Sequence, residues 1–198
     1  MRLERLSKPQ RLELCRISQQ GLQQAAETLS RLLRQPVAVE VADAWMADGQ
    51  QSASSSEHLL GICLQLSGDV NGCLLLTLTE SCAQWLSNQL LGCAESRELL
   101  QEPASSTLKE VGNIIASSFL ACLDDQLDLR AMPSPPQLSC APLEQLLEGC
   151  RLQAENACLI VRTRLSGADA SEGCLQGAIY LFSDPGSLTK LLEQIDQG

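Results

Sequence analysis

Aromatic residues are scarce in this chain of 198 residues, which has two Trp, one Tyr and two Phe. Aliphatic side chains must therefore fill the core, and few rings are left for stacking on nucleic-acid bases. Basic residues are also in the minority, because 14 Lys and Arg stand against 24 Asp and Glu and give a net charge of −10. Such a charge repels nucleic acid and anionic membrane surfaces. We therefore expect no nucleic-acid partner and no membrane partner.

Long apolar runs are missing as well. The apolar runs, such as residues 73–76, are much shorter than the roughly 20 residues needed to cross a bilayer. The first residues, Met-Arg-Leu-Glu-Arg, contain no apolar signal-peptide segment. The sequence therefore predicts a cytoplasmic protein of the ordinary globular class.

Residues that commonly carry catalysis or bind metals are few or dispersed. The single histidine, His58, excludes most His-based catalytic triads, and no Gly-rich phosphate loop with a following Lys is present. The ten cysteines are scattered without a CxxC pair. We interpret them as reduced thiols that act as small hydrophobic side chains, and we expect neither a zinc site nor a cofactor of the protein's own.

What the sequence does contain is an order of elements that occurs twice. Apolar residues recur with a spacing of three and four over residues 9–34 and again over residues 102–127, which predicts two long amphipathic helices. Each helix is followed by an extended segment, a hairpin and a short helix that ends the half. We expect an additional helix over residues 142–150, a polar Ser-rich loop over residues 50–56, and a hairpin turn over residues 167–173.

This pattern predicts one α+β domain, over residues 1–198, made of two pseudo-repeats. The first covers about residues 8–92 and the second about residues 102–197, with an offset of about 94 residues that matches Arg16 to Glu110. Hairpins favour a mainly antiparallel sheet, on which the two long helices would pack through their apolar faces.

The second long helix has a polar stripe opposite its apolar face, at about 100° of rotation per residue. The stripe consists of Ser106, Glu110, Asn113 and Ser117. One alternative is that these are ordinary solvated residues. Another is that residues 107–110 form a capping box, in which Glu110 would only satisfy a backbone donor at the start of the helix. Pro103 favours an earlier start, which would leave Glu110 free for another role.

One stretch of this helix carries a family resemblance. It reads Ser106-Thr-Leu-Lys-Glu110-Val-Gly-Asn113, and Pro136 follows after 22 further residues. This spacing resembles the signature of the CheC, CheX and FliY chemotaxis phosphatases, which is Asp or Ser, three residues, Glu, two residues, Asn, 22 residues and Pro. The segment that reads Met132-Pro-Ser-Pro-Pro136 is also similar to CheC proteins.

The resemblance implies a phosphatase that removes phosphate from the aspartyl group of a CheY-type response regulator. It implies that Glu110 pairs with a lysine of the regulator and that Asn113 orients the attacking water. Ser106 and Pro136 would support the helix and the strand behind it, and the regulator would supply Mg²⁺. The alternative implied by the same family is a non-catalytic adaptor that binds CheY or the receptor deamidase CheD.

The first half departs from the signature at every position. At the same offset it has Leu12, Arg16, Gln19 and Ala42 in place of the serine, glutamate, asparagine and proline. Arg16 would repel a regulator lysine, and the amide of Gln19 is one methylene further from the backbone than that of an asparagine. We therefore predict one active helix per chain and, by resemblance to CheC, a monomer.

Overall fold

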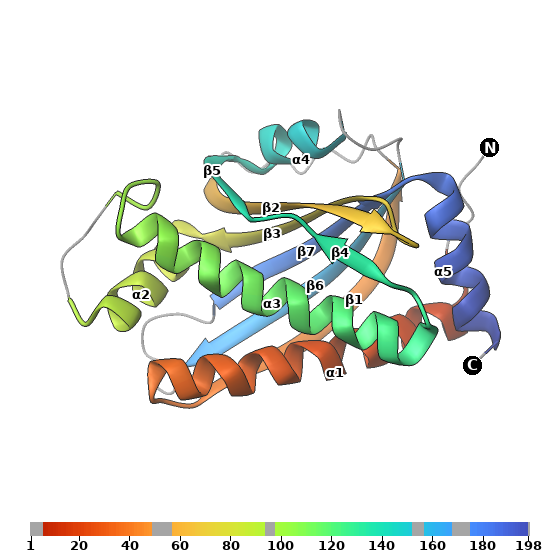
Figure 1. Cartoon of the computed structure of the whole chain (residues 1–198), viewed down its shortest axis with the longest axis horizontal. Helices are drawn as coiled ribbons and strands as arrows, with labels where there is room; N and C mark the ends of the chain where they lie inside the picture. The colour runs from red at the N-terminus through yellow and green to blue at the C-terminus, as the bar shows by residue number, and fades with distance from the viewer. Residues whose placement is uncertain (1–5, 49–56, 94–97, 152–156, 168–174, 198) are drawn as a thin grey trace.

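The structure is a computed structural model that describes residues 6–48, 57–93, 98–151, 157–167 and 175–197 (Figure 1). The predicted loop over residues 50–56 and nearly all of the predicted turn over residues 167–173 lie outside these ranges. The helices are α1 (Lys8–Leu33), α2 (Glu80–Leu91), α3 (Ala104–Leu127), α4 (Leu143–Arg151) and α5 (Pro185–Gln197). The strands are β1 (Val37–Asp48), β2 (His58–Gly68), β3 (Gly72–Thr79), β4 (Ala131–Pro133), β5 (Gln137–Pro142), β6 (Ala157–Gly167) and β7 (Leu175–Ser183).

The strands form one sheet in the order β1-β6-β7-β3-β2-β4, and β5 also pairs with β2. Every pairing among the described strands is antiparallel, so the predicted α+β class with an antiparallel sheet is confirmed. In this order, strands from the first half of the chain lie next to strands from the second half. Strand β1 pairs with the β6–β7 hairpin, whereas β4 and β5 pair with the β2–β3 hairpin.

The long helices α1 and α3 lie side by side on one face of the sheet and run in opposite directions (Figure 1). Their buried residues, among them Ile17, Leu29, Leu108 and Phe119, join one core with Leu60, Ile62 and Leu64 of β2. Gly21 of α1 permits this close approach, because a Cβ atom there would lie 3.0 Å from the Cα of Phe119. The apolar faces that the sequence predicts are therefore the faces that pack on the sheet.

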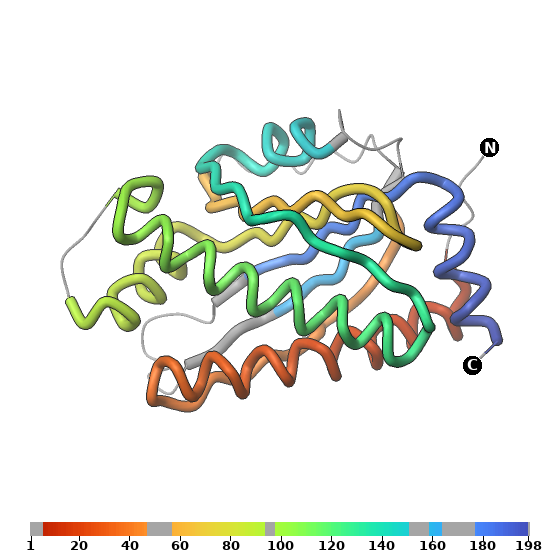
Figure 2. Tube along the Cα trace, viewed as in Figure 1, coloured from red at the N-terminus to blue at the C-terminus, as the bar shows by residue number. Residues whose placement is uncertain are grey.

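The opposite face of the sheet carries the short helix α4. Strand residues alternate between faces, so that Leu74 joins the core under α1 and α3 while Leu75 joins a second cluster under α4. Figure 2 shows how the chain reaches this position: after α3 it runs back along the edge of the sheet through β4 and β5 to α4. The additional helix predicted for the second half thus covers the second face.

Local sequence explains where several elements begin and end. Ser7 and Gln10 form a capping box at the start of α1, where the Ser7 N–H donates to Gln10 Oε1 at 2.9 Å. The Thr79 hydroxyl accepts from the Cys82 N–H at the start of α2, and Gly92 ends that helix with a φ of 64°. Strand β1 extends beyond the predicted segment to Asp48, because β6 pairs with its whole length apart from a bulge between Val41 and Asp43. No helix in the described ranges is both long and apolar enough to cross a membrane.

Candidate active site on helix α3

The structure places the predicted polar stripe on the outer surface of α3. Leu108 and Val111 are fully buried beneath the helix, whereas Ser106, Glu110, Asn113 and Ser117 are exposed. Glu110 and Asn113 are separated by about 4.5 Å along the helix axis and by about 60° around it. Neither side chain forms a hydrogen bond or an ion pair with any residue that the structure describes. Both polar groups are therefore available to a partner.

The start of α3 excludes the capping-box interpretation of residues 107–110. The helix begins at Ala104, so Glu110 lies in its second turn and cannot cap the first. The Thr107 hydroxyl donates to the Pro103 carbonyl at 3.0 Å instead of accepting from a backbone N–H. Ser106 also donates to the Pro103 carbonyl at 3.0 Å, which ties the first residue of the signature to the start of the helix.

Gly112, between the two candidate catalytic residues, brings α3 directly onto β2. A Cβ atom at Gly112 would lie 2.5 Å from Cγ2 of Ile62, which is fully buried. The glycine therefore lets the helix backbone approach the sheet closely and fixes the height of Glu110 and Asn113 above it. The sequence alone does not indicate this role, because it depends on which strand lies beneath the helix.

Pro136 lies at an irregularity in the strand behind α3. Leu66 of β2 pairs with Pro133 and Cys63 pairs with Gln137, so residues 64–65 of β2 face residues 134–136 across the ladder. The extra residue makes a β-bulge, where a proline is tolerated because no ladder hydrogen bond requires its missing N–H. Ala42, its counterpart at the same offset, also lies at a register shift, between Val41 and Asp43 of β1.

The corresponding positions of α1 are occupied by contacts inside the protein. The Gln19 Nε2 group donates to the Val39 carbonyl at 2.9 Å, and Gln19 Oε1 accepts from the Val41 N–H at 2.8 Å. Both ends of this amide are therefore bound to β1. No acid and amide pair comparable to Glu110 and Asn113 is available among these residues of α1.

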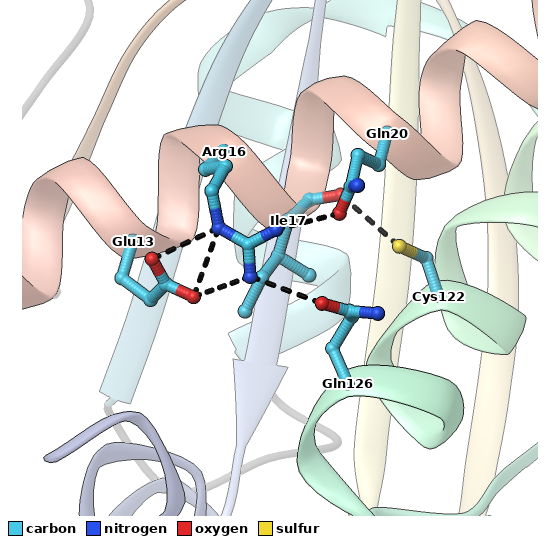
Figure 3. Close-up of polar contacts among 6 residues, drawn as sticks. All are labelled: Glu13, Arg16, Ile17, Gln20, Cys122 and Gln126. Atoms are coloured by element: carbon cyan, nitrogen blue, oxygen red, sulfur yellow. Dashed lines mark hydrogen bonds and ion pairs between the residues drawn. The ribbon is translucent and has the colours of Figure 1, made fainter. Parts of the chain in front are cut away.

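Arg16 is the centre of a polar network that links α1 to α3 (Figure 3). Its guanidinium group contacts the Glu13 carboxylate at 2.5 Å, and it donates to Gln20 at 2.9 Å and to Gln126 of α3 at 3.0 Å. The pKa of Glu13 is lowered, first by this hydrogen bond from Arg16 and also by the positive charge of the same group. Arg16 thus connects the two helices at the position that aligns with Glu110.

Potential metal ligands gather away from α3. Within the described ranges, the one group of three or more Cys, His, Asp or Glu side chains close enough to share an ion consists of Cys63, Cys73 and Cys150. These cysteines contribute to the cluster under α4, on the opposite face of the sheet from Leu108 and Val111. Their dispersed positions in the sequence gave no sign that they would meet.

Sequence similarity links the chain to a curated chemotaxis protein. The chain is 28% identical over 126 residues to the CheY-P phosphatase CheC of Bacillus subtilis (strain 168), and the match spans 60% of each protein. No protein-family model matches the chain.

Solved structures extend the similarity to nearly the whole fold. Thermotoga maritima FliY matches with a TM-score of 0.78 and 15% identity, over 97% of this chain and 98% of that structure. FliM from the H. pylori FliG–FliM complex matches with a TM-score of 0.70 and 13% identity, over 95% of this chain and 100% of that structure.

A third structure shares the fold over a smaller part of the chain. The CheX–CheY–BeF3–Mg²⁺ complex of Borrelia burgdorferi matches with a TM-score of 0.51 and 16% identity, over 83% of this chain and 95% of that one. At these identities the structures show a common fold. Together with the sequence similarity to CheC, that fold makes this chain similar to the CheC, CheX and FliY chemotaxis proteins.

Proposed function

We propose that this chain hydrolyses the aspartyl phosphate of a CheY-type response regulator through Glu110 and Asn113 of α3. One observation carries the proposal: an acid and an amide are exposed on the outer face of α3, without partners among the described residues, in the spacing that resembles the family signature. A carboxylate can pair with a cation of the regulator, and an amide can both donate and accept hydrogen bonds at the reacting water.

In this mechanism the chemistry is shared between two proteins. Glu110 pairs with a lysine of the regulator and fixes α3 across the phosphorylated site. The Asn113 amide then enters that site and holds a water molecule in line with the phosphorus. Placing the water is sufficient for a large acceleration, because phosphoryl transfer depends on positioning and charge compensation more than on a covalent partner. Mg²⁺ is supplied by the regulator.

The packing of α3 supports this role. Its anchoring residues are buried, and the close contact at Gly112 holds the helix against β2, so the outer face forms a rigid docking surface. A preorganised surface of this kind loses little conformational freedom when it binds. Ser106, which lies four residues before Glu110, stabilises the start of the helix through its hydrogen bond to the Pro103 carbonyl.

The comparisons support the same class of partner. CheC of Bacillus subtilis is described as a CheY-P phosphatase, and CheX has been solved in a complex with CheY, BeF3 and Mg²⁺. We further propose that α3 is the one active helix of the chain, because the Gln19 amide is bound to β1 and Arg16 is bound to Glu13, Gln20 and Gln126.

A second candidate function is that of a non-catalytic adaptor for CheY or CheD. The observation that favours it is the similarity to FliM, which has been solved in a complex with FliG, at a TM-score of 0.70. The same fold is thus found in an assembly with another protein. An adaptor would use the surface of α3 for binding without needing the amide of Asn113 for chemistry.

The test is the release of inorganic phosphate from CheY charged with acetyl phosphate in the presence of Mg²⁺. We expect the chain to accelerate release and the Asn113→Ala variant to lose about 100-fold or more of that acceleration, because the water is no longer held in line. Ser117→Ala is the matched control, since Ser117 is exposed on the same stripe one turn further along. It should keep the wild-type rate.

Binding measured in parallel separates the two candidate functions. The affinity of the chain for CheY with bound Mg²⁺ and BeF3 can be followed by titration, with both wild type and Asn113→Ala. Tight binding without any acceleration of phosphate release, across all available CheY proteins, would overturn the phosphatase proposal and support the adaptor.

A further inference from the structure

Three cysteine side chains from separate elements converge on the face of the sheet that α4 covers. Cys63 lies on β2, Cys73 on β3 and Cys150 on α4. Their sulfur atoms are separated by 3.0 Å between Cys63 and Cys73, 3.3 Å between Cys73 and Cys150, and 4.0 Å between Cys63 and Cys150. The three thiols therefore surround a single point between the sheet and the helix.

The distances fit a site for one ion with small adjustments. Thiolates bind zinc-sized ions at about 2.3 Å, so two sulfur ligands of one ion are separated by roughly 3.8–4.0 Å. The pair of Cys63 and Cys150 already has this separation, at 4.0 Å. The other two pairs would have to open by less than about 1 Å, which small side-chain rotations can provide.

The surroundings of the cluster favour a low coordination number. Apolar side chains pack around the thiols, among them Leu75, Leu146, Leu147 and Phe182. Cys73 is fully buried and Cys150 is 3% exposed, whereas Cys63 is partly exposed and offers a route of entry. The described residues supply no fourth ligand close to these three sulfur atoms.

We propose that Cys63, Cys73 and Cys150 form a three-thiolate binding site for a soft metal ion, Cu(I). Thiolates select soft ions such as Cu(I), whereas structural zinc almost always takes four ligands. An apolar shell that hinders water from acting as a fourth ligand favours the ion that accepts three. Each thiol gives up its proton to the solvent when the ion binds, and no electron is transferred.

Without a bound ion, the three thiols contribute little to the stability of the fold. An S–H group is a weak donor, so the contacts among the three cysteines add little stability over aliphatic side chains of similar size. A bound ion would link β2 and β3 to α4, the helix that has no counterpart in the first half of the chain. The site would thus fasten α4 to the sheet.

The test is a competition for Cu(I) with the chromophoric chelator bicinchoninic acid, using the full chain without oxygen and without CheY. We expect wild type to withdraw one equivalent of Cu(I) more than Cys63→Ser, and the same loss in Cys150→Ala. Cys63 is the first choice because it is partly exposed, and circular dichroism checks that each variant is folded. Cys82→Ser is the matched control, since Cys82 is fully buried on α2 but belongs to no group of potential metal ligands among the described residues, and it should bind like wild type.

X-ray absorption of the loaded protein gives a second, independent readout. Three sulfur neighbours around copper in wild type, and fewer in Cys63→Ser, would support the site. Equal uptake by wild type and both cluster variants would overturn it. So would tighter binding of Zn²⁺ than of Cu(I), or a disulfide between Cys63 and Cys73 in protein that has been kept under reducing conditions. None of these readouts depends on phosphatase activity.

Discussion

Glu110 projects from α3 into solvent without a partner in the described part of the chain, so its charge is available to a cation on another protein. We predict that Glu110→Gln raises KM for phosphorylated CheY about tenfold, which corresponds to about 1.4 kcal/mol, and leaves kcat nearly unchanged. Steady-state phosphate release over a range of CheY concentrations measures both constants, and the effect should shrink at high salt.

The control for Glu110 is another acidic residue of the same helix. Asp125 is exposed near the opposite end of α3, and Asp125→Asn removes the same charge without touching the signature. It should leave KM unchanged. If Glu110→Gln instead lowered kcat at constant KM, the docking role assigned to Glu110 would be wrong.

Asp184 is a residue whose effect on stability should depend on pH. It precedes α5 and accepts from the Ser187 hydroxyl at 2.6 Å and from the Ser187 N–H at 2.9 Å, and these two bonds, in that order, lower its pKa. A carboxyl whose pKa is lowered by folding stabilises the protein above its ordinary pKa of about 4, and this contribution is lost as the pH falls through the folded value.

We therefore predict that Asp184→Ala costs about 1 kcal/mol at pH 7, or a fall of about 2–4 °C in Tm, and much less at pH 2.5. Thermal unfolding at both pH values measures the difference. Asp184→Asn keeps an acceptor but cannot titrate, and it should change Tm little at pH 7. A destabilisation by Asp184→Ala that is equal at both pH values would contradict the assigned cause.

These residues show what a sequence reveals at this scale. The Glu110–Asn113 spacing involves neighbours along the chain, so it could be predicted. The bonds of Gln19 to β1 could not, because they depend on how α1 packs against a strand 20 residues away. The contact between Cys63 and Cys150, which are 87 residues apart, could not be predicted from the sequence either.

At the scale of elements, the contact between α3 and β2 should be sensitive to a single methyl group. At Gly112 an added Cβ would lie 2.5 Å from Cγ2 of Ile62, a β-branched side chain that cannot move aside easily. Overpacking of this kind costs about 1–3 kcal/mol, and alanine returns about 1 kcal/mol of helix propensity. We predict that Gly112→Ala lowers the free energy of unfolding by about 1 kcal/mol and also slows phosphate release, because Asn113 is displaced. Urea unfolding and the phosphatase assay measure the two effects.

Gly149 of α4 provides the matched control, because a Cβ atom there would meet nothing within 4 Å. Gly149→Ala should stabilise the protein by up to about 1 kcal/mol. The double variant Gly112→Ala, Ile62→Ala should show a favourable coupling, since the second change removes the clashing methyl group. Additive effects of the two substitutions would mean that Ile62 does not limit the approach of α3.

The start of α3 and its two faces could be predicted from the sequence, whereas the strand on which it packs could not. Apolar spacing gave the two faces, and Pro103 indicated a start before residue 107, as the helix from Ala104 shows. The identity of the strand beneath the helix is a tertiary property. The sequence therefore offered no reason for a glycine at position 112, which the structure explains by its contact with Ile62.

For the whole molecule, the pairing of strands between the two ends of the chain has consequences for folding. The hairpins were predictable from turn residues and alternating patterns. The pairing of β1 with β6, and of β5 with β2, was not, because nothing local specifies a partner more than 70 residues away. This interleaving means that neither half of the chain contains a complete sheet of its own.

The interleaved sheet should therefore unfold as one unit, and the two tryptophans can test this. Trp45 lies on the edge strand β1, where the Arg162 guanidinium is 4.8 Å from its ring, and Trp85 lies on α2 and packs on the core under α1 and α3. Trp85→Phe and Trp45→Phe each leave one fluorescent reporter. In each variant we predict that the urea transition followed by fluorescence coincides with the transition followed by circular dichroism, as two-state unfolding requires. Loss of Trp45 fluorescence at a lower urea concentration than the helical signal would show that β1 separates before the rest, because its pairing with β6 would then contribute too little to couple the two ends of the sheet.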